Sequence, residues 1–288
     1  MTINQLSFSG LVVSILSIIA GAIVRATGSG DGCGASWPTC NGEIVPKLET
    51  SSELIEFSHR FISGFLLIIT LIIFIKSFKD KVPILQKRII WLLTFFVLLE
   101  ALIGAVIVVY EWVGLNSSTP RIIAVPLHLV NTFGLLGTYT LLFHLTKNSK
   151  NSLNNFFDRG FKISLCLFLL SGATGSIAAL ADVIFPSESF IAGLAEDFDS
   201  NSEVLIRLRI LHPIIATVLS IYLYSEANRL QKEYKILTKN IKVLVFLGVL
   251  LGLLNVVSNI ILPLSILHLL MADLLWVVYV DKSAEKIR

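Results

Sequence analysis

Histidine is the residue type in this sequence with the clearest capacity for metal chemistry. The chain of 288 residues contains five histidines, which are His59, His128, His144, His212 and His268. A neutral imidazole ring is a ligand for iron, copper or zinc. Any single histidine is explained as well by a hydrogen bond to a neighbouring helix. Four of them, however, form the two pairs 59/128 and 212/268, and this pairing indicates two metal-binding sites.

A polar loop precedes the first of these histidines. Residues 29–46 read SGDGCGASWPTCNGEIVP, with Cys33 and Cys40 on either side of GASWPT. In an oxidising compartment this pair can form a disulfide, as a structural staple or as a redox pair, and two free thiols are the remaining alternative. Glu56 precedes His59 by three residues, which places its carboxylate on the same helix face. Such a carboxylate either favours the helix dipole or stabilises positive charge on a substrate.

The segments that carry these residues are long enough to cross a lipid bilayer. Hydrophobic residues make up 55% of the chain and charged residues 15%, with a mean hydropathy of +0.81, which excludes an ordinary soluble domain. Apolar runs of about 20 residues, sufficient for a hydrocarbon core of ~30 Å, occur at 8–26, 55–75, 89–110, 122–145, 161–181, 205–224, 241–259 and 261–280. We therefore predict an all-α polytopic membrane protein with eight transmembrane helices. The first run continues into GAIVRATGSG and is predicted to be a retained helix rather than a signal peptide.

The distribution of basic residues predicts the orientation in the membrane. Segments 76–88, 147–162, 229–242 and 282–288 hold 17 of the 23 lysines and arginines, whereas 182–203 has six acidic residues and no basic one. Cytoplasmic loops are enriched in Lys and Arg, so we predict a multi-pass protein of the cell (plasma) membrane with both termini cytoplasmic. The basic residues do not gather on one face with aromatic residues, so no nucleic-acid partner is expected.

The order of the segments suggests an internal repeat. A polar stretch, TKNSKNSLNNFFDRG, separates the fourth and fifth spans, HLVNTFGLL in span four resembles HLLMADLLW in span eight, and LIGAVIVV in span three resembles LLGLLNVV in span seven. GAIVRATGSG at the end of span one is also weakly similar to GATGSIAALAD near the end of span five. We predict two pseudo-symmetric four-helix bundles, at 1–147 and 161–288, joined by a cytoplasmic linker at 148–160.

The four paired histidines share one depth in this topology. Each lies early in an even-numbered span, roughly 6–11 Å below the outer helix ends at 1.5 Å per residue. Ionisable side chains within spans are costly and usually functional. Two imidazoles facing each other across a four-helix bundle suit a haem iron, and the sites lack the further ligands of a zinc or copper shell. His144, near the cytoplasmic end of span four, has no partner at its depth and is assigned to the membrane interface.

Five arginines lie on the outer side, where basic residues are otherwise scarce: Arg25, Arg60, Arg121, Arg207 and Arg209. Haem propionates are anions that form strong charge-assisted hydrogen bonds with arginine. The alternative is that these side chains extend to the interface and meet lipid phosphates. Their concentration around the histidines favours propionate binding.

The motif RATGSGDGCGASWPTCNGEIVP, followed by EFSHR and later by LGLLNVV and LPLSILHLLMA, resembles the haem A synthase family over the length of the chain. Members of that family oxidise a methyl group of haem O to the formyl group of haem A for cytochrome oxidase. The resemblance implies a membrane-bound, haem-dependent oxidoreductase that acts by successive hydroxylations. It implies haem O as substrate at His59 and His128, haem b as cofactor at His212 and His268, and Glu56 as the catalytic carboxylate. It also implies that Cys33 and Cys40 form an outer cysteine pair.

On this interpretation the arginines divide between the two sites. Arg25, Arg60 and Arg121 are assigned to the substrate haem, and Arg207 and Arg209 to haem b. The expected partners are haem O, a haem O synthase, an electron donor and the lipid bilayer, and a homo-oligomer is compatible with the sequence.

Two positions depart from the family pattern or from the repeat. Some family members carry a second cysteine pair between spans five and six, but residues 182–203 contain no cysteine, so this chain lacks a second station for disulfide exchange. Glu100, in span three, has no counterpart in span seven, where the repeat places Gly248, and we favour a polar contact between helices for it. Cys166, within span five, is interpreted as a packing residue.

The main competing interpretation is a di-haem b-type membrane cytochrome that transfers electrons or delivers haem. It explains the histidines equally well, but it does not explain Glu56 above His59 or a cysteine loop over one pair alone. Arg209 stands three residues before His212, where the first half has Glu56. The N-terminal half is therefore predicted to be the reactive one. Solute transport is disfavoured, because no broken helix lines a site at the membrane midplane.

Overall fold

The structure is a computed structural model that describes residues 1–148, 152–154, 156–230 and 235–285. Through these ranges its regular structure is helical, with one isolated bridge between Cys40 and Glu43. The long helices are α1 (Ile3–Ala26), α2 (Ser51–Lys79), α3 (Ile84–Val109), α4 (Thr119–Lys147), α5 (Arg159–Ile184), α8 (Leu211–Leu230), α9 (Lys235–Val257) and α10 (Leu262–Glu285). Eight segments of the described chain are long and apolar enough to cross a membrane. The predicted all-α fold with eight membrane helices is confirmed.

Capping residues explain why two of the helices begin earlier than the apolar runs suggest. The side chain of Thr2 accepts from the backbone N–H of Gln5, and the side chain of Gln5 accepts from the backbone N–H of Thr2. Thr50 and Glu53 form the same reciprocal pair at the start of α2. Such capping boxes satisfy two amide groups that have no partner within the helix. They extend the helices into polar sequence that the hydrophobic pattern alone excludes.

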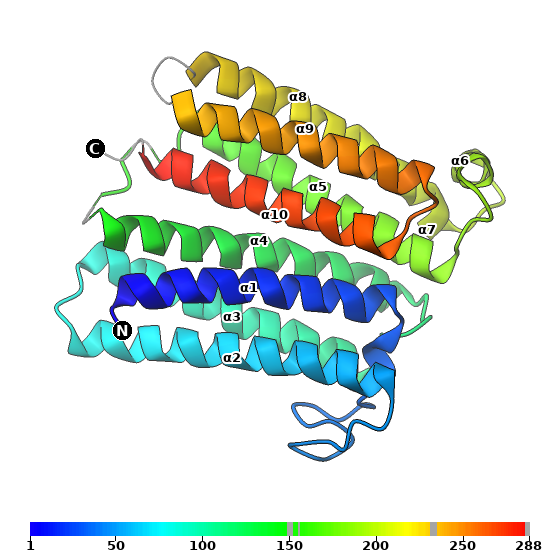
Figure 1. The fold of residues 1–288 in the computed structure, drawn as a ribbon, viewed down its shortest axis with the longest axis horizontal. Coiled ribbons are helices and arrows are strands. Elements are labelled where there is room, and N and C mark those ends of the chain that lie inside the picture. The colour runs from blue at the N-terminus through cyan, green and yellow to red at the C-terminus, as the bar shows by residue number, and fades with distance from the viewer. Residues whose placement is uncertain (149–151, 155, 231–234, 286–288) are drawn as a thin grey trace.

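The sixth span is interrupted near its start. It consists of α7 (Val204–Arg207), the 3₁₀ turn η2 (Leu208–Ile210) and then α8. A short helix that the sequence analysis did not predict, α6 (Phe190–Phe198), precedes it. Figure 1 shows α6 beyond the ends of α5 and α8, on the side of the molecule opposite the start of α1.

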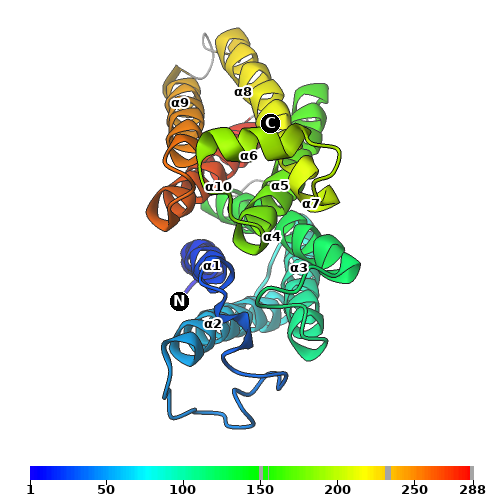
Figure 2. The ribbon, with the colours of Figure 1, turned by 90° about the vertical axis from the view of Figure 1, so that its right-hand side faces the viewer.

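The long helices form two groups, which Figure 2 shows one above the other. Helices α1 to α4 pack together in one group, and α5, α8, α9 and α10 in the other, while α4 contacts both α5 and α10 across the boundary. Helix α1 begins and α10 ends at the same end of the molecule (Figure 1). The division into domains at 1–147 and 161–288 remains a prediction, and residues 149–151 and 155 of the linker 148–160 lie outside the described ranges.

An aromatic cluster fills the boundary between the groups. Phe133 of α4 packs against Phe168 of α5 and Trp276 of α10, with ring centroids 6.1 and 6.0 Å away. The indole Nε1–H of Trp276 donates to the carbonyl oxygen of Phe133 over 2.8 Å. A Cβ atom on Gly172 would lie 2.3 Å from the Phe133 ring, so only glycine lets α5 approach so closely. The buried aromatic surface and the satisfied indole together fix the contact between the two groups.

A second polar contact joins the groups at the other end of the bundle. His144 Nδ1 lies 2.8 Å from Oδ1 of Asp281 on α10, and His144 is buried. His144 therefore has an acidic partner on α10, which was not expected for a histidine assigned to the membrane interface. A partner on α10 was not visible from span four alone.

Candidate functional site

The polar loop between α1 and α2 is closed by a disulfide between Cys33 and Cys40, whose Cα atoms are 4.4 Å apart. Both cysteines are fully buried. Backbone hydrogen bonds from Asn41 to Cys33 and from Cys40 to Glu43 complete a compact turn. Of the alternatives left open by the sequence, two free thiols are excluded in this structure.

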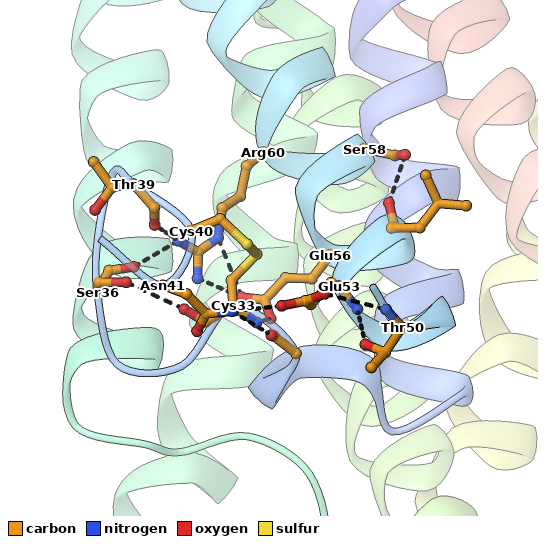
Figure 3. Close-up of a disulfide and its surroundings, with 12 residues drawn as sticks. Cys33, Ser36, Thr39, Cys40, Asn41, Thr50, Glu53, Glu56, Ser58 and Arg60 are labelled. Carbon is orange, nitrogen blue, oxygen red and sulfur yellow. Dashed lines mark hydrogen bonds and ion pairs between the residues drawn. A yellow bond between two sulfur atoms is a disulfide. The ribbon is translucent and has the colours of Figure 1, made fainter. Parts of the chain in front are cut away.

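Two side chains of α2, one helical turn apart, anchor this loop, as Figure 3 shows. The Glu56 carboxylate accepts from the backbone N–H of Cys33 (2.8 Å) and from the Arg60 guanidinium. Arg60 also donates to the carbonyl oxygens of Ser36 and Thr39. Glu56 is 2% exposed, so its two oxygens hold a fixed position beneath the disulfide.

The C-terminal group carries the opposite charge at the position that matches Glu56. Arg209, three residues before His212, is 9% exposed. Its guanidinium donates to three carboxylates, over 3.1 Å to Asp182, 2.8 Å to Asp197 and 3.3 Å to Glu196. Further donations reach Ser187 Oγ and the carbonyl oxygen of Gly193. All five N–H groups of Arg209 therefore have protein acceptors.

All four paired histidines lie early in their spans, as predicted. They follow the starts of the spans by six to nine residues, which corresponds to roughly 9–14 Å of helix. This is slightly deeper than expected, chiefly because α2 and α4 begin before the apolar runs.

Each of these histidines packs its ring on a glycine of the preceding span. A Cβ atom built on that glycine would lie 3.0 Å from Cε1 of His59, 3.8 Å from His128, 2.9 Å from His212 and 2.9 Å from His268. The glycines are, in the same order, Gly21, Gly104, Gly175 and Gly252. The missing side chains leave room for the rings, so the two helix groups hold their histidines by the same device.

The Nδ1 atom of each ring contacts the residue four positions before that glycine. Nδ1 lies 3.1 Å from the carbonyl oxygen of Ser17 in His59, 3.2 Å from that of Ser171 in His212, and 2.9 Å from that of Gly248 in His268. A carbonyl oxygen can only accept, so Nδ1 carries the proton in these three rings. Nε2 is then the unprotonated nitrogen and is free to bind a metal.

His128 differs from the other three, because its Nδ1 atom is buried and has no hydrogen-bond partner among the described residues. Its Nδ1 lies 3.2 Å from Oε1 of Glu100, which occupies the position of Ser17, Ser171 and Gly248. The polar contact between helices predicted for Glu100 is present: Asn131 of α4 donates to Oε2 over 2.5 Å. The proximity of Glu100 to His128 was not predicted from the sequence, although aligning spans three and seven at Gly104 and Gly252 reveals the position.

The C-terminal pair has dimensions that fit a single iron between two imidazoles. The ring centroids of His212 and His268 are 6.1 Å apart and the rings are inclined by 80°. Two metal–imidazole bonds of about 2 Å each, together with the two ring radii, span a distance of this size. Within the described ranges no group of three or more His, Cys, Asp or Glu side chains could hold a metal ion. The pair therefore offers two imidazole donors, a set that a haem iron can take as ligands.

Two arginines near the N-terminal pair have polar atoms that the protein leaves unsatisfied. The Nε atoms of Arg25 and Arg121 are buried and have no hydrogen-bond partner in the described part of the chain. NH1 of Arg121 donates to three backbone carbonyls between α3 and α4, which orients the guanidinium. Buried polar atoms are normally paired, so these two guanidinium groups have hydrogen-bonding capacity left for an anionic ligand such as a haem propionate.

The other predicted propionate ligands differ in how far the protein already occupies them. Arg60 and Arg209 are engaged by the loop and the acidic cluster described above. Arg207 is exposed, and no side-chain hydrogen bond of Arg207 is present among the described residues. The assignment of arginines to haem remains a prediction, for which Arg25, Arg121 and Arg207 have the freer guanidinium groups.

Cys166 is exposed on α5. Its interpretation as a packing residue is therefore wrong: the thiol lies on the outer surface of the helix rather than between helices.

The fold and the site define a class, the multi-pass helical membrane proteins with paired histidines near one surface. The family model COX15-CtaA, described as a cytochrome oxidase assembly protein, matches residues 4–280. The chain belongs to this family of cytochrome oxidase assembly proteins.

Known relatives carry two kinds of name. A protein of Thermus thermophilus named protoheme IX farnesyltransferase is 34% identical over 281 residues, which are 94% of this chain and 46% of the relative. Heme A synthases of Bacillus licheniformis and of Bacillus cereus are 41% identical over 100 residues and 40% identical over 97 residues. Each match covers about a third of this chain (34% and 33%) and about a third of the relative (33% and 31%). The chain thus spans about half the length of the Thermus relative.

Proposed function

We propose that this protein is a haem A synthase, which oxidises a methyl group of haem O to the formyl group of haem A. One observation carries the proposal: the two histidine pairs are built alike, but only one has a buried carboxylate and a disulfide loop at its outer end. The family match and the relatives named heme A synthase support it. A cytochrome that only transfers electrons needs no such difference.

In the N-terminal half, His59 and His128 hold haem O through their Nε2 atoms, and Arg25 and Arg121 bind its propionates. Two successive hydroxylations of the methyl carbon would each insert one oxygen atom of dioxygen, while two electrons from the donor and two protons reduce the other oxygen atom to water. The hydrated aldehyde that results would lose water. Glu56 stabilises positive charge that develops at that carbon. Donors from Cys33 and Arg60 fix the Glu56 carboxyl group, so it needs no reorientation during the reaction.

In the C-terminal half, His212 and His268 hold haem b, and Arg207 binds a propionate. A haem bound there supplies one-electron transfer to the reactive site. Arg209 acts indirectly: it draws the acidic residues of α6 and the end of α5 over the outer end of the pair. The cofactor half is thereby closed by protein side chains alone.

The orientation and the partners follow from the same proposal. The ends of the bundle with the basic connections are cytoplasmic, as are both termini, so the reaction takes place near the outer surface of the cell membrane. A haem O synthase supplies the substrate, since the Thermus relative named for farnesyl transfer to protohaem contains a region similar to this chain. An electron donor and self-association complete the expected partners.

The test is to express the chain in membranes that make haem O but lack their own haem A synthase. Extracted pigments are separated by chromatography and identified by mass. Haem A or its hydroxylated precursor, absent from the vector control, supports the proposal. Haem B and unaltered haem O bound to the purified protein, with electron donors present, would instead identify a cytochrome or haem carrier.

A further inference from the structure

One of the four candidate ligands has an acidic side chain beside its Nδ1 atom, where each of the other three has a hydrogen bond to a backbone carbonyl oxygen. Glu100 precedes Gly104 by four residues, and its Oε1 lies 3.2 Å from Nδ1 of His128. A peptide carbonyl oxygen takes this position for His59, His212 and His268. The difference is confined to one histidine of the N-terminal pair.

The Glu100 carboxyl group is held in place from its other oxygen. Asn131, one turn after His128 on α4, donates through Nδ2 to Oε2 of Glu100 (2.5 Å) and to the carbonyl oxygen of Phe96 (2.9 Å). Asn131 is 5% exposed. The acidic side chain beside Nδ1 of His128 is therefore held by Asn131, which contacts both Glu100 and the backbone of α3.

The matching positions of the C-terminal half carry no such group. The repeat that pairs His128 with His268 and Gly104 with Gly252 places Gly248 opposite Glu100 and Met271 opposite Asn131. A carboxyl group within a membrane span is costly and is usually retained for a function. A contact between α3 and α4 alone does not require an acid aimed at the ring nitrogen of a candidate ligand.

We propose that Glu100 is a positioning residue for His128, which directs Nε2 of this ring to the substrate haem and lowers the reduction potential of that iron relative to the C-terminal one. The inference rests on the proposed binding of haem by the N-terminal pair. Nδ1 of His128 is buried and has no hydrogen-bond partner among the described residues. A metal bound at Nε2 would require a proton on Nδ1, and Oε1 of Glu100, 3.2 Å away, is the side-chain acceptor beside it. Such outer partners raise the basicity of a ligating imidazole. A more basic ligand stabilises the oxidised iron.

The experiment uses the full chain with His212→Ala and His268→Ala, which leaves one histidine pair, and haem B as the probe. Haem binding is measured by absorbance titration, and the midpoint potential by spectroelectrochemistry, with and without Glu100→Gln. We expect about tenfold weaker binding, the lower end of the effect usual for an outer partner of a metal ligand, and a shift of the midpoint potential to a higher value. Glutamine keeps the shape of the side chain and its ability to accept from Asn131.

Two controls separate the possible failures. Asn131→Met copies the C-terminal half and leaves the carboxyl group beside His128, so it should change the potential less than Glu100→Gln does. Glu100→Gln is also made in the chain with all four histidines, where an unchanged midpoint potential of the C-terminal haem reports an intact fold.

The outcomes are distinct. If the double histidine variant binds no haem while the C-terminal haem of the Glu100→Gln chain is normal, the N-terminal pair is not a haem site and the proposed function fails with it. If it binds haem but Glu100→Gln changes neither affinity nor potential, Glu100 is only a contact between helices and the inference is overturned. If both change as expected, Glu100 distinguishes the two sites electronically.

Discussion

The two halves of this protein hold their histidines in the same way and differ most at their outer ends. In both halves a glycine of the odd-numbered span makes room for an imidazole, and the residue one turn earlier fixes Nδ1. Above this common frame, one half has a disulfide loop anchored by a buried carboxylate, and the other has a buried arginine among acids. The residues that contact the imidazole rings are therefore different from the residues that distinguish the two halves. The two sets lie about one helical turn apart.

The inversion of charge is the sharpest part of the comparison. Glu56 precedes His59 by three residues and receives hydrogen bonds from the loop, whereas Arg209 precedes His212 by three and donates to the segments around it. Each buried charge has its partners within its own half. The two hydrogen-bond networks are therefore separate, although Asp182 of the second network also interacts electrostatically with Arg25 of α1.

The largest effect is expected from removing one ligand of each pair. Purified His212→Ala should lose the C-terminal haem, and His59→Ala should lose product formation but keep that haem, because each imidazole has no substitute at its depth. Haem-to-protein ratios and pigment analysis measure the two outcomes. His144→Ala serves as the control, since His144 lies outside both pairs, and loss of haem from it would contradict the assignment.

Glu56→Gln tests the role of the buried carboxylate that is found in the N-terminal half and replaced by Arg209 in the C-terminal half. We expect product formation to fall by about 10²-fold or more, the effect of removing one group that stabilises transition-state charge, with haem content unchanged. Glutamine can still accept from Cys33, so the loop should stay in place. Glu49→Gln, an exposed position in the same loop, is the matched control. Undiminished haem A formation by Glu56→Gln would remove the carboxylate from the mechanism.

Arg209→Met should act on stability rather than on chemistry. Removing the guanidinium leaves the carboxylates of Asp182 and Asp197, whose side chains are only 15% and 14% exposed, without their partner. Breaking a buried ion pair from one side typically costs about 3 kcal/mol. Denaturation in detergent, followed through the C-terminal haem absorbance, measures the loss. Equal loss at the N-terminal site would show that the two hydrogen-bond networks are not independent.

The smallest effect is expected from replacing the glycines that contact the histidine rings by alanine. In Gly252→Ala the new Cβ atom would lie 2.9 Å from His268 Cε1, whereas in Gly104→Ala it would lie 3.8 Å from His128 Cε1. Overpacking of the first kind costs about 1 kcal/mol, so haem retention at the C-terminal site should weaken about fivefold. Gly104→Ala should leave its site unchanged, and a similar loss from both variants would refute the steric explanation.

The sequence predicted the spans and the histidine pairs because both are local properties of the chain. Continuous apolar runs give the helices, and the common depth of the four histidines follows from counting residues along them. The helix ends were less accurate, because Thr2 and Thr50 form caps in polar sequence. The short α6 was not predicted because its nine residues contain no long apolar run.

Contacts between distant segments were not predictable in this way. The partners of Arg209 come from the end of α5 and from α6, and Asp281 is 137 residues from His144. Arg60 was expected to bind a propionate but donates to the carbonyl oxygens of Ser36 and Thr39. Such pairings depend on how loops return over the helix ends, which no periodicity encodes. The partner of Glu100 was the exception, since the repeat marks its position.

The hydrogen bond from Trp276 to the Phe133 carbonyl has a mechanical consequence. It joins α4, which carries His128 of the N-terminal pair, to α10, which carries His268 of the C-terminal pair. The surrounding aromatic rings fill the space on either side. Sliding α4 past α10 by one helical turn, about 5.4 Å, would break this bond and open the buried cluster. The distance between the two histidine pairs is therefore fixed by the packing of α4 against α10. Any electron that passes between them crosses the same gap at every turnover.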